Sequence, residues 1–236
     1  MKHPTVVVFV EFPDPTFPTG GFLKHLAYPD AKLVGFYELD VGESVQPIRD
    51  EHEEECRATL QAQAERFEQQ GIRTEWSLIF DHDRVEARHQ IARDDGADAV
   101  LLPGGANTLG KVLVAARRTQ NVEKKMSTLL NTVDRDDLIS LDLIHIADET
   151  VPEGEKEGKR ILTEMKSVLE ELGVPSVQIE QEVRTEDDVA FELNRASRDY
   201  DLLVLGETEQ DIGDKIFGPV AEYVVDDRDV PVLITR

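Results

Sequence analysis

The stretch that decides the fold lies near the end of the chain, where residues 199–206 read Asp-Tyr-Asp-Leu-Leu-Val-Leu-Gly. Residues 96–104 read Gly-Ala-Asp-Ala-Val-Leu-Leu-Pro-Gly and have the same pattern. In both, an aspartate precedes a short apolar run that ends at a glycine. Such runs are typical of buried strands in a parallel sheet. The two stretches therefore predict equivalent strands in two copies of one unit.

Working outward from these strands, apolar runs alternate with helical patterns, which predicts βαβ units and an α/β fold. Two long acidic helices, expected at Asp50–Gln70 and Glu153–Leu172, each end before a glycine. Shorter helices are expected near Asp83 and Asp187, and a last one at Lys215–Val225. The expected strands are Thr5–Val10, Lys32–Leu39, Thr74–Phe80, Ala99–Leu102, Val112–Ala116, Leu138–Ile146, Ser176–Val183, Leu202–Leu205 and Pro231–Thr235.

The order of these elements repeats, so we expect two doubly wound parallel-sheet domains in tandem, residues 1–110 and 111–236. The first domain breaks off at the glycine-rich segment 104–110 and therefore lacks its last helix and strand. A sheet without its last strand has an exposed edge. We expect this edge to be covered by the second domain, as in an internal pseudo-dimer, or by another copy of the chain.

The charge of the chain excludes several classes of partner. There are 26 Lys and Arg against 49 Asp and Glu, which gives a formal net charge of −23. Such a surface repels nucleic acid and anionic membranes. The basic residues are ten Lys and sixteen Arg. Few lysines with so many acids favour a halophile, because molar salt screens such charge within about 3 Å; an acidic protein from a mesophile is the alternative.

We expect a cytoplasmic protein. Its apolar stretches are five or six residues long, far below the ~20 residues of a spanning helix, and the N-terminus has no apolar region of signal-peptide length. Cys56 is the single cysteine and cannot form an internal disulfide. Its helical spacing with Leu60, Ala64 and Phe67 predicts a core position.

The second half resembles the universal stress protein family. Residues 201–206, the segment Gly-Pro-Val-Ala-Glu-Tyr-Val at 218–224 and Val-Pro-Val-Leu-Ile at 230–234 are similar to the family's C-terminal stretch. The segment Leu-Ile-His-Ile at 143–146 is similar to its second strand. The resemblance covers nearly the whole chain as a tandem pair, closely in the second half and loosely in the first.

The resemblance implies a nucleotide site, which in this family uses Gly-x2-Gly-x9-Gly-Ser/Thr and an acidic residue at the end of the first strand. Glycines and a helix N-terminus bring backbone amides to the phosphates. Gly206 matches the first glycine, with Gly213 and Gly218 as candidates for the others. Glu11 and Asp14 are the acidic candidates, both in the first half.

The second half departs from this pattern. Glu209 stands in place of the second glycine and Pro219 in place of the hydroxyl residue. Glu207 and Glu209 would repel a triphosphate, and Arg117 and Arg118 stand where the acidic residue belongs. We therefore expect no cofactor, with ATP held by a modified loop as the alternative.

Other residues have a structural and a functional interpretation. Gly104, Gly105 and Gly110 fit an anion-binding loop or, more commonly, a tight turn between the halves. Arg117 and Arg118 could bind phosphate or pair with carboxylates. The metal-capable side chains do not have the spacing of a metal site. They are Asp81, His82, Asp83 and His89 in one segment and His52 and Cys56 in another.

We find no catalytic arrangement of serine, histidine or paired carboxylates, so we do not expect an enzyme. The leading expectation is a regulatory, stress-responsive protein that acts through protein–protein contact without binding ATP in the usual way. A nucleotide-binding regulator and a partner of a membrane transporter are the alternatives. We expect a dimer or internal pseudo-dimer, and neither nucleic-acid binding nor membrane insertion.

Overall fold

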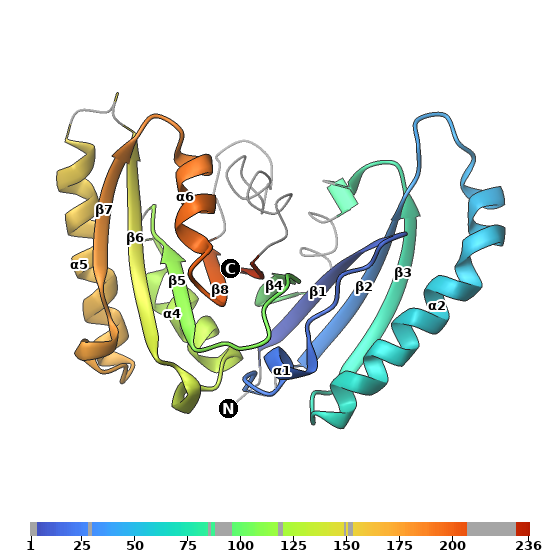
Figure 1. Cartoon of the computed structure of the whole chain (residues 1–236), viewed down its shortest axis with the longest axis horizontal. Helices are drawn as coiled ribbons and strands as arrows, with labels where there is room; N and C mark the ends of the chain where they lie inside the picture. The colour runs from blue at the N-terminus through green and yellow to red at the C-terminus, as the bar shows by residue number, and fades with distance from the viewer. Residues whose placement is uncertain are drawn as a thin grey trace.

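The chain forms an α/β structure around a single, mostly parallel sheet (Figure 1). A computed structural model describes residues 4–27, 30–84, 86–87, 96–117, 120–148, 150, 153–206 and 230–236. The strands are β1 (Thr5–Phe12), β2 (Asp30–Glu38), β3 (Thr74–Asp81), β4 (Ala99–Leu102), β5 (Lys111–Ala115), β6 (Ser140–Asp148), β7 (Gln181–Glu186), β8 (Leu202–Gly206) and β9 (Val232–Thr235). The helices are α1 (Gly20–Leu23), α2 (Val45–Gln69), α4 (Val122–Thr132), α5 (Gly154–Glu171) and α6 (Val189–Ser197), with 3-10 helices η1 (Arg135–Asp137) and η2 (Ser176–Gln178).

The strand order is β3-β2-β1-β4-β9-β8-β5-β6-β7. From one edge of the sheet the order is β3, β2, β1, β4, and from the other edge it is β7, β6, β5, β8. Each set gives the third, second, first and fourth strand of its half, so the two halves have matching topology. In each half the first strand lies between the second and the fourth, which creates a point where the chain direction across the sheet reverses. Open α/β sheets bind ligands at such points, outside the carboxyl ends of the strands.

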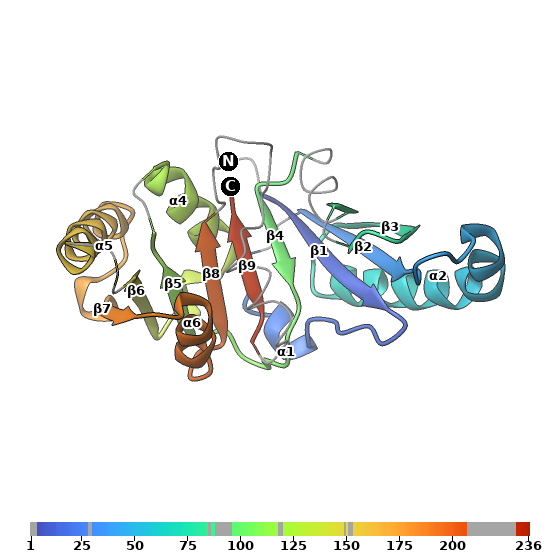
Figure 2. The same ribbon diagram turned by 90° about the horizontal axis from the view of Figure 1, so that it is seen from above.

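One strand joins the two halves, and the two separate sheets that we expected are therefore continuous. β9 pairs in parallel with β8 and antiparallel with β4. Leu233 lies opposite Val204 on one side and Leu101 on the other. The exposed edge that the first half would otherwise have is thus covered by a strand from the second half. Figure 2 shows β4, β9 and β8 side by side at the centre of the sheet.

Apolar side chains form a core on each face of the sheet. On one face, α1, α2, α4 and α5 contribute to a cluster that includes Phe22, Leu60, Met126 and Ile161. On the other face, α6 contributes Leu193 to a second cluster. Strand β9 contributes side chains to both cores, because Leu233 belongs to the first cluster and Ile234 to the second. Cys56 is buried in the first cluster, as its helical spacing predicts.

Most expected elements lie within a few residues of their predicted bounds, with two corrections. Helix α2 begins at Val45, before the expected start at Asp50. Ser44 is its N-cap residue, and Pro47 lies in its first turn, where proline is tolerated. The expected strand Ser176–Val183 is wrong at its start. Pro175 precedes the 3-10 helix η2, and strand β7 begins only at Gln181, where pairing with Leu143 of β6 sets in.

The junction between the halves is held by an aspartate that precedes a strand. The Asp201 carboxylate accepts hydrogen bonds from the Gly110 and Lys111 N–H groups, both at 2.8 Å, and from the Thr108 hydroxyl at 2.7 Å. In the first half, Asp98 accepts a bond from the Thr5 N–H at 3.0 Å. In both halves, therefore, the aspartate before the fourth strand fixes the start of the first strand.

The glycine-rich segment before β5 belongs to this junction. A Cβ on Gly104 would lie 2.5 Å from the backbone nitrogen of Pro231, and one on Gly21 would lie 2.2 Å from the carbonyl oxygen of Asn107. Thr19 donates a hydrogen bond to the Ala106 carbonyl at 3.0 Å. These contacts support the tight turn that we expected over an anion-binding loop. Across the described part of the chain, no helix is both long and apolar enough to span a membrane.

We predict that Leu233→Ala lowers the free energy of unfolding by about 2–5 kcal/mol, because Leu233 is 1% exposed and packs where both halves meet. Trp76 on β3 is the single tryptophan and reports on the first half. In Leu233→Ala, the urea midpoint followed by Trp76 fluorescence should fall as far as the midpoint followed by far-UV circular dichroism. A normal Trp76 transition in the variant would show that β9 does not stabilise the first half. Val177→Ala at an exposed site is the control.

We predict that Asp201→Asn lowers stability by about 1–3 kcal/mol at pH 7, since hydrogen bonds to a charged acceptor are lost. Burial alone would raise the pKa of the Asp201 carboxyl, but the bonds from Lys111, Thr108 and Gly110 hold the pKa below its usual value. A depressed carboxyl pKa stabilises the fold above the pKa of the unfolded chain, and this contribution is lost as the pH falls through the folded value. Urea titrations from pH 7 to 3 should therefore show the two proteins converging; a constant difference would contradict this account.

Candidate functional site

A large cavity opens at the carboxyl ends of β5, β6 and β8, where the chain direction across the second half reverses. Its volume is about 900 Å³. Val114 of β5, Ile144 of β6 and Val204 of β8 are among the residues that line it, together with the starts of α4 and α5. A cavity of this size and place is typical of a small-molecule site.

The cavity wall combines an apolar floor with a basic rim. Met126, Met165 and Leu193 add apolar surface from three helices. The charged lining residues are Arg117, Lys125, Lys156, Arg160, Asp148, Glu153 and Glu157. Among the described lining residues bases thus outnumber acids by four to three, although acids outnumber bases in the chain by 49 to 26. This local reversal of charge favours a ligand with an anionic group.

Two of the helices that begin at the cavity, α4 and α5, have unusual N-caps. Asn121 before α4 has φ 55° and Glu153 before α5 has φ 66°, and neither side chain makes a capping hydrogen bond. These are the positive-φ residues other than glycine within the described segments. Left-handed backbone at such residues is costly and often marks functional sites. Gln120, Val122 and Gly154, next to these caps, line the cavity.

His145 forms part of the cavity floor on β6. It is 9% exposed, and its Nδ1 lies 2.7 Å from the Ala116 carbonyl oxygen. Since a carbonyl accepts, Nδ1 carries the proton in this contact. A Cβ on Gly158 of α5 would lie 2.4 Å from His145 Cδ2. Glycine at this position therefore lets α5 lie directly against the imidazole.

Gly206 ends β8 and lines the cavity. A Cβ on Gly206 would lie 3.3 Å from the Nζ of Lys125, which extends from α4. The absence of a side chain at residue 206 thus leaves space for an ammonium group at the end of β8. Arg117, two residues beyond β5, also lines the cavity.

The acidic residues on the α5 side are engaged with neighbours. Lys156 lies 3.3 Å from Glu153, and Arg160 lies 2.6 Å from Glu157. The hydrogen bond from Arg160 lowers the pKa of the Glu157 carboxyl. A hydrogen bond from the Thr150 hydroxyl likewise lowers the pKa of Asp148. The carboxylates of Glu157 and Asp148 are therefore charged at neutral pH, and Glu153 and Glu157 each pair with a base on α5.

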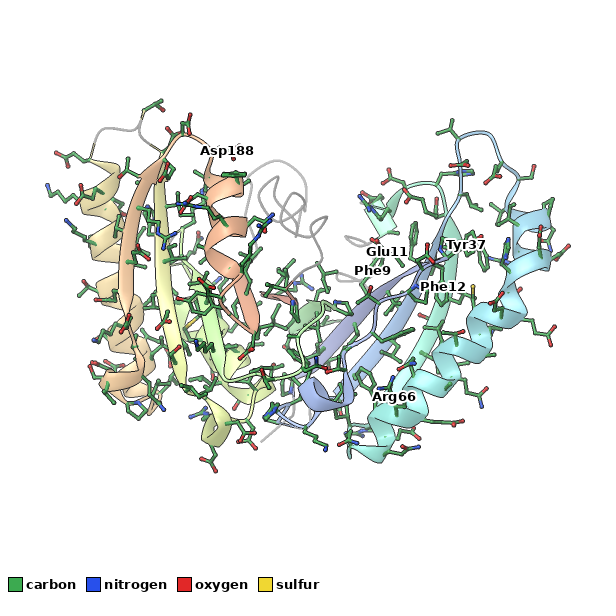
Figure 3. All side chains as sticks on the ribbon, viewed as in Figure 1. Phe9, Glu11, Phe12, Tyr37, Arg66 and Asp188 are labelled. Atoms are coloured by element: carbon green, nitrogen blue, oxygen red, sulfur yellow. The ribbon has the colours of Figure 1, made fainter. Side chains whose placement is uncertain are left out.

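Of the nucleotide candidates from the sequence, the structure describes Gly206, Glu11 and Asp14. Gly206 lines the cavity, whereas Gly213, Gly218, Glu207, Glu209 and Pro219 lie outside the described residues. Glu11 and Asp14 are in the first half and are not among the residues that line the cavity. The Glu11 carboxylate lies 3.7 Å from the Arg84 guanidinium. Figure 3 shows Glu11, Phe9 and Tyr37 in the first half and Asp188, the N-cap residue of α6, in the second.

The other candidate residues have structural partners. Asp83 accepts a hydrogen bond from the Glu86 N–H, as an N-cap does, and Asp188 caps α6 through the Phe191 N–H. His52 stacks on Tyr37. Within the described residues there is no cluster of three or more side chains able to hold a metal ion. Arg118 and His89 lie outside these residues.

Sequence reasoning missed Lys125 and the cavity role of His145. Lys125 sits beside Lys124 in an ordinary amphipathic helix, and nothing in its spacing distinguishes it. The signal that existed was Gly206, because a glycine at a strand end leaves room for a neighbouring group. Gly158 was a similar signal, since glycine inside a helix is costly unless something must approach it closely.

These features define a class of protein, a doubly wound α/β fold with a ligand-sized cavity at its switch point. Residues 111–236 match the family described as "Usp: Universal stress protein family". The match covers more than half of the chain, which therefore belongs to the universal stress protein family. No curated protein sequence matches the chain.

Solved structures show the same fold. A universal stress protein from Archaeoglobus fulgidus DSM 4304 is 13% identical, with a TM-score of 0.58, and the match covers 98% of each chain. A structure from Pseudomonas aeruginosa UCBPP-PA14, assigned to the same family, is 15% identical, with a TM-score of 0.51. That match covers 99% of this chain and 93% of the other. At these identities the likeness concerns the fold alone.

We predict that Gly158→Ala destabilises the protein by about 1–3 kcal/mol, because the new methyl group meets the His145 ring. In a His145→Ala background the same substitution should instead stabilise by up to about 1 kcal/mol, since alanine is the better helix former. Urea unfolding of the four proteins measures both effects. An equal cost in the two backgrounds would show that His145 is not what the glycine accommodates.

Proposed function

We propose that the chain is a regulatory universal stress protein that binds a small organic molecule in the cavity between β5, β6 and β8 and has no committed reaction. The observation that carries this proposal is the cavity itself. Its volume of about 900 Å³ lies in the range of small-molecule sites, and apolar residues make up most of its floor.

We propose that ATP in the usual arrangement of the family is not the preferred occupant. Arg117 lines the cavity at the end of β5, where the resemblance implies an acidic residue. The acidic residues of the first half, Glu11 and Asp14, do not substitute for it, since neither lines this cavity. ATP bound through a modified loop that includes Gly206, Gly213 and Gly218 is the alternative, and the experiment below includes it.

We further propose that the ligand changes how the protein contacts other proteins. Among the described residues that line the cavity there is no serine or cysteine, the usual nucleophiles for covalent chemistry. Contact with a partner is then the output that remains for a ligand-binding fold. The proposal extends to a transporter subunit as one such partner, and to a tandem organisation in which residues 1–110 are a shortened copy of residues 111–236.

The test is a thermal-shift screen with nucleotides, sugar phosphates and organic acids, each at high concentration with and without Mg²⁺. A ligand at about 100 times its Kd adds about 2.7 kcal/mol of stability, which raises Tm by several degrees. We expect at least one compound to do so. Ala115→Phe, which fills the cavity from β5, should abolish the response.

Ala58→Phe is the matched control, because Ala58 is exposed on α2 in the first half. It should respond like the unsubstituted protein. Circular dichroism confirms that both variants are folded before their responses are compared. If no compound raises Tm, or if Ala115→Phe responds fully, the cavity is not a ligand site.

A further inference from the structure

We propose that two copies of this chain form a symmetric dimer through strand β3, by antiparallel pairing of one β3 with the other. This surface lies at the outer edge of the first half and is independent of the cavity in the second half. Strand β3 is the last strand in the order of the sheet and the outermost strand of the first half (Figure 1). Within the described part of the chain, no strand pairs with its outer side.

Alternate residues of β3 turn their main-chain groups outward. The Arg73 carbonyl accepts a hydrogen bond from the Ala31 N–H at 2.9 Å. The Asp81 carbonyl accepts one from the Leu39 N–H at 3.0 Å. Because the main-chain groups of successive residues in a strand point to opposite sides, the odd-numbered residues face β2 and the even-numbered residues face away from it. The outward residues are Thr74, Trp76, Leu78 and Phe80.

The two edge strands of the sheet differ in charge. Strand β7, at the opposite edge, has the sequence Gln-Glu-Val-Arg-Thr-Glu, in which every second residue is charged. Charged side chains are a common protection against pairing at an exposed edge. Strand β3 is eight residues long, and its stretch Trp-Ser-Leu-Ile-Phe at 76–80 carries no charge. An uncharged edge of this length is a template for another strand.

One register gives every outward residue of β3 a partner. In an antiparallel pair, two opposite residues exchange hydrogen bonds when both turn their main-chain groups toward each other. With Ser77 on a twofold axis, Trp76 lies opposite Leu78 of the second copy. Thr74 then lies opposite Phe80, so that outward residues meet outward residues throughout, whereas a shift by one residue would set them opposite inward ones. The strand is therefore complementary to itself, as the interface of a symmetric dimer must be.

The same register brings opposite charges together at both ends of the ladder. Arg73 lies opposite Asp81 of the second copy, at a position without main-chain bonds, where side chains come closest. The Arg73 side chain is 77% exposed, and its hydrogen bonds to Asp30 leave a guanidinium with several N–H groups able to serve a second carboxylate. A shift by two residues in one direction would instead set Glu75 opposite Asp81. In the other direction Arg73 would meet Ile79 and lose its carboxylate.

The net charge of the chain decides the conditions under which the dimer forms. Two chains of formal charge −23 repel each other. Molar salt shortens the Debye length to about 3 Å, which removes most of this repulsion and leaves the main-chain hydrogen bonds. The dimer should therefore become stronger as salt is added.

Sedimentation equilibrium in about 0.2 M and about 2 M KCl measures this dependence. We expect a monomer–dimer equilibrium that shifts toward dimer in the higher salt, without larger species, because pairing uses the β3 edge of each copy. Monomers alone at about 0.1 mM protein in both salts would overturn the proposal.

Ser77→Asp tests the position of the axis, because it places two carboxylates directly opposite each other. It should raise the Kd of the dimer at least ~10-fold. Ser77→Thr is the matched control and should leave the Kd unchanged, with circular dichroism confirming that both variants are folded. Equal Kd values for the two variants would contradict the pairing of β3.

Disulfide trapping with copper phenanthroline in air tests the register independently. Ser77→Cys should cross-link to itself, because opposite residues at such a position have Cα atoms about 4.5 Å apart, within the disulfide range. Glu75→Cys alone should not, but a mixture of Glu75→Cys and Ile79→Cys should. The unsubstituted protein is the blank, since Cys56 is buried. Equal self-cross-linking of Ser77→Cys and Glu75→Cys, or none in Ser77→Cys, would overturn the proposal.

Discussion

The structure depends on one four-residue strand that forms hydrogen bonds on both sides. β9 is parallel to β8 and antiparallel to β4, so it serves as the fifth strand of both halves of the sheet. Backbone groups at a strand edge need partners, and an open edge invites aggregation. Among its described residues the first half has no strand of its own for this edge. The second half meets this requirement with a strand whose four residues are all buried.

This arrangement separates two roles of the second half. Its β9 completes the sheet at the centre of the molecule, while its other strands place a cavity at their carboxyl ends. Thr235 belongs to both, because it pairs with Ala99 of β4 and also lines the cavity. A ligand in the cavity would therefore lie next to the strand that joins the halves.

Much of the fold was predictable because apolar periodicity marks its strands and helices and glycines mark where they end. The strands at Ala99–Leu102 and Leu202–Leu205 agree with the structure to within one residue, since both are buried runs with clear boundaries. Strand β7 was harder, because it is a half-exposed edge strand whose start is fixed by pairing with β6 and not by its own residues. The sharing of β9 was also hidden, because pairing between distant strands leaves no local pattern. At the site, the sequence pointed to Gly206 and Arg117, which both line the cavity, whereas Lys125 reaches it from another element and was not predicted.

The double pairing of β9 has a consequence for how the chain is made. Every other described strand precedes β9 in the sequence, so on the ribosome β4 and β8 emerge before the strand that lies between them. For that period the nascent chain holds two unsatisfied edges and two incomplete cores. During this period the high density of carboxylates opposes aggregation, because like-charged nascent chains on neighbouring ribosomes repel each other before β9 pairs with both edges.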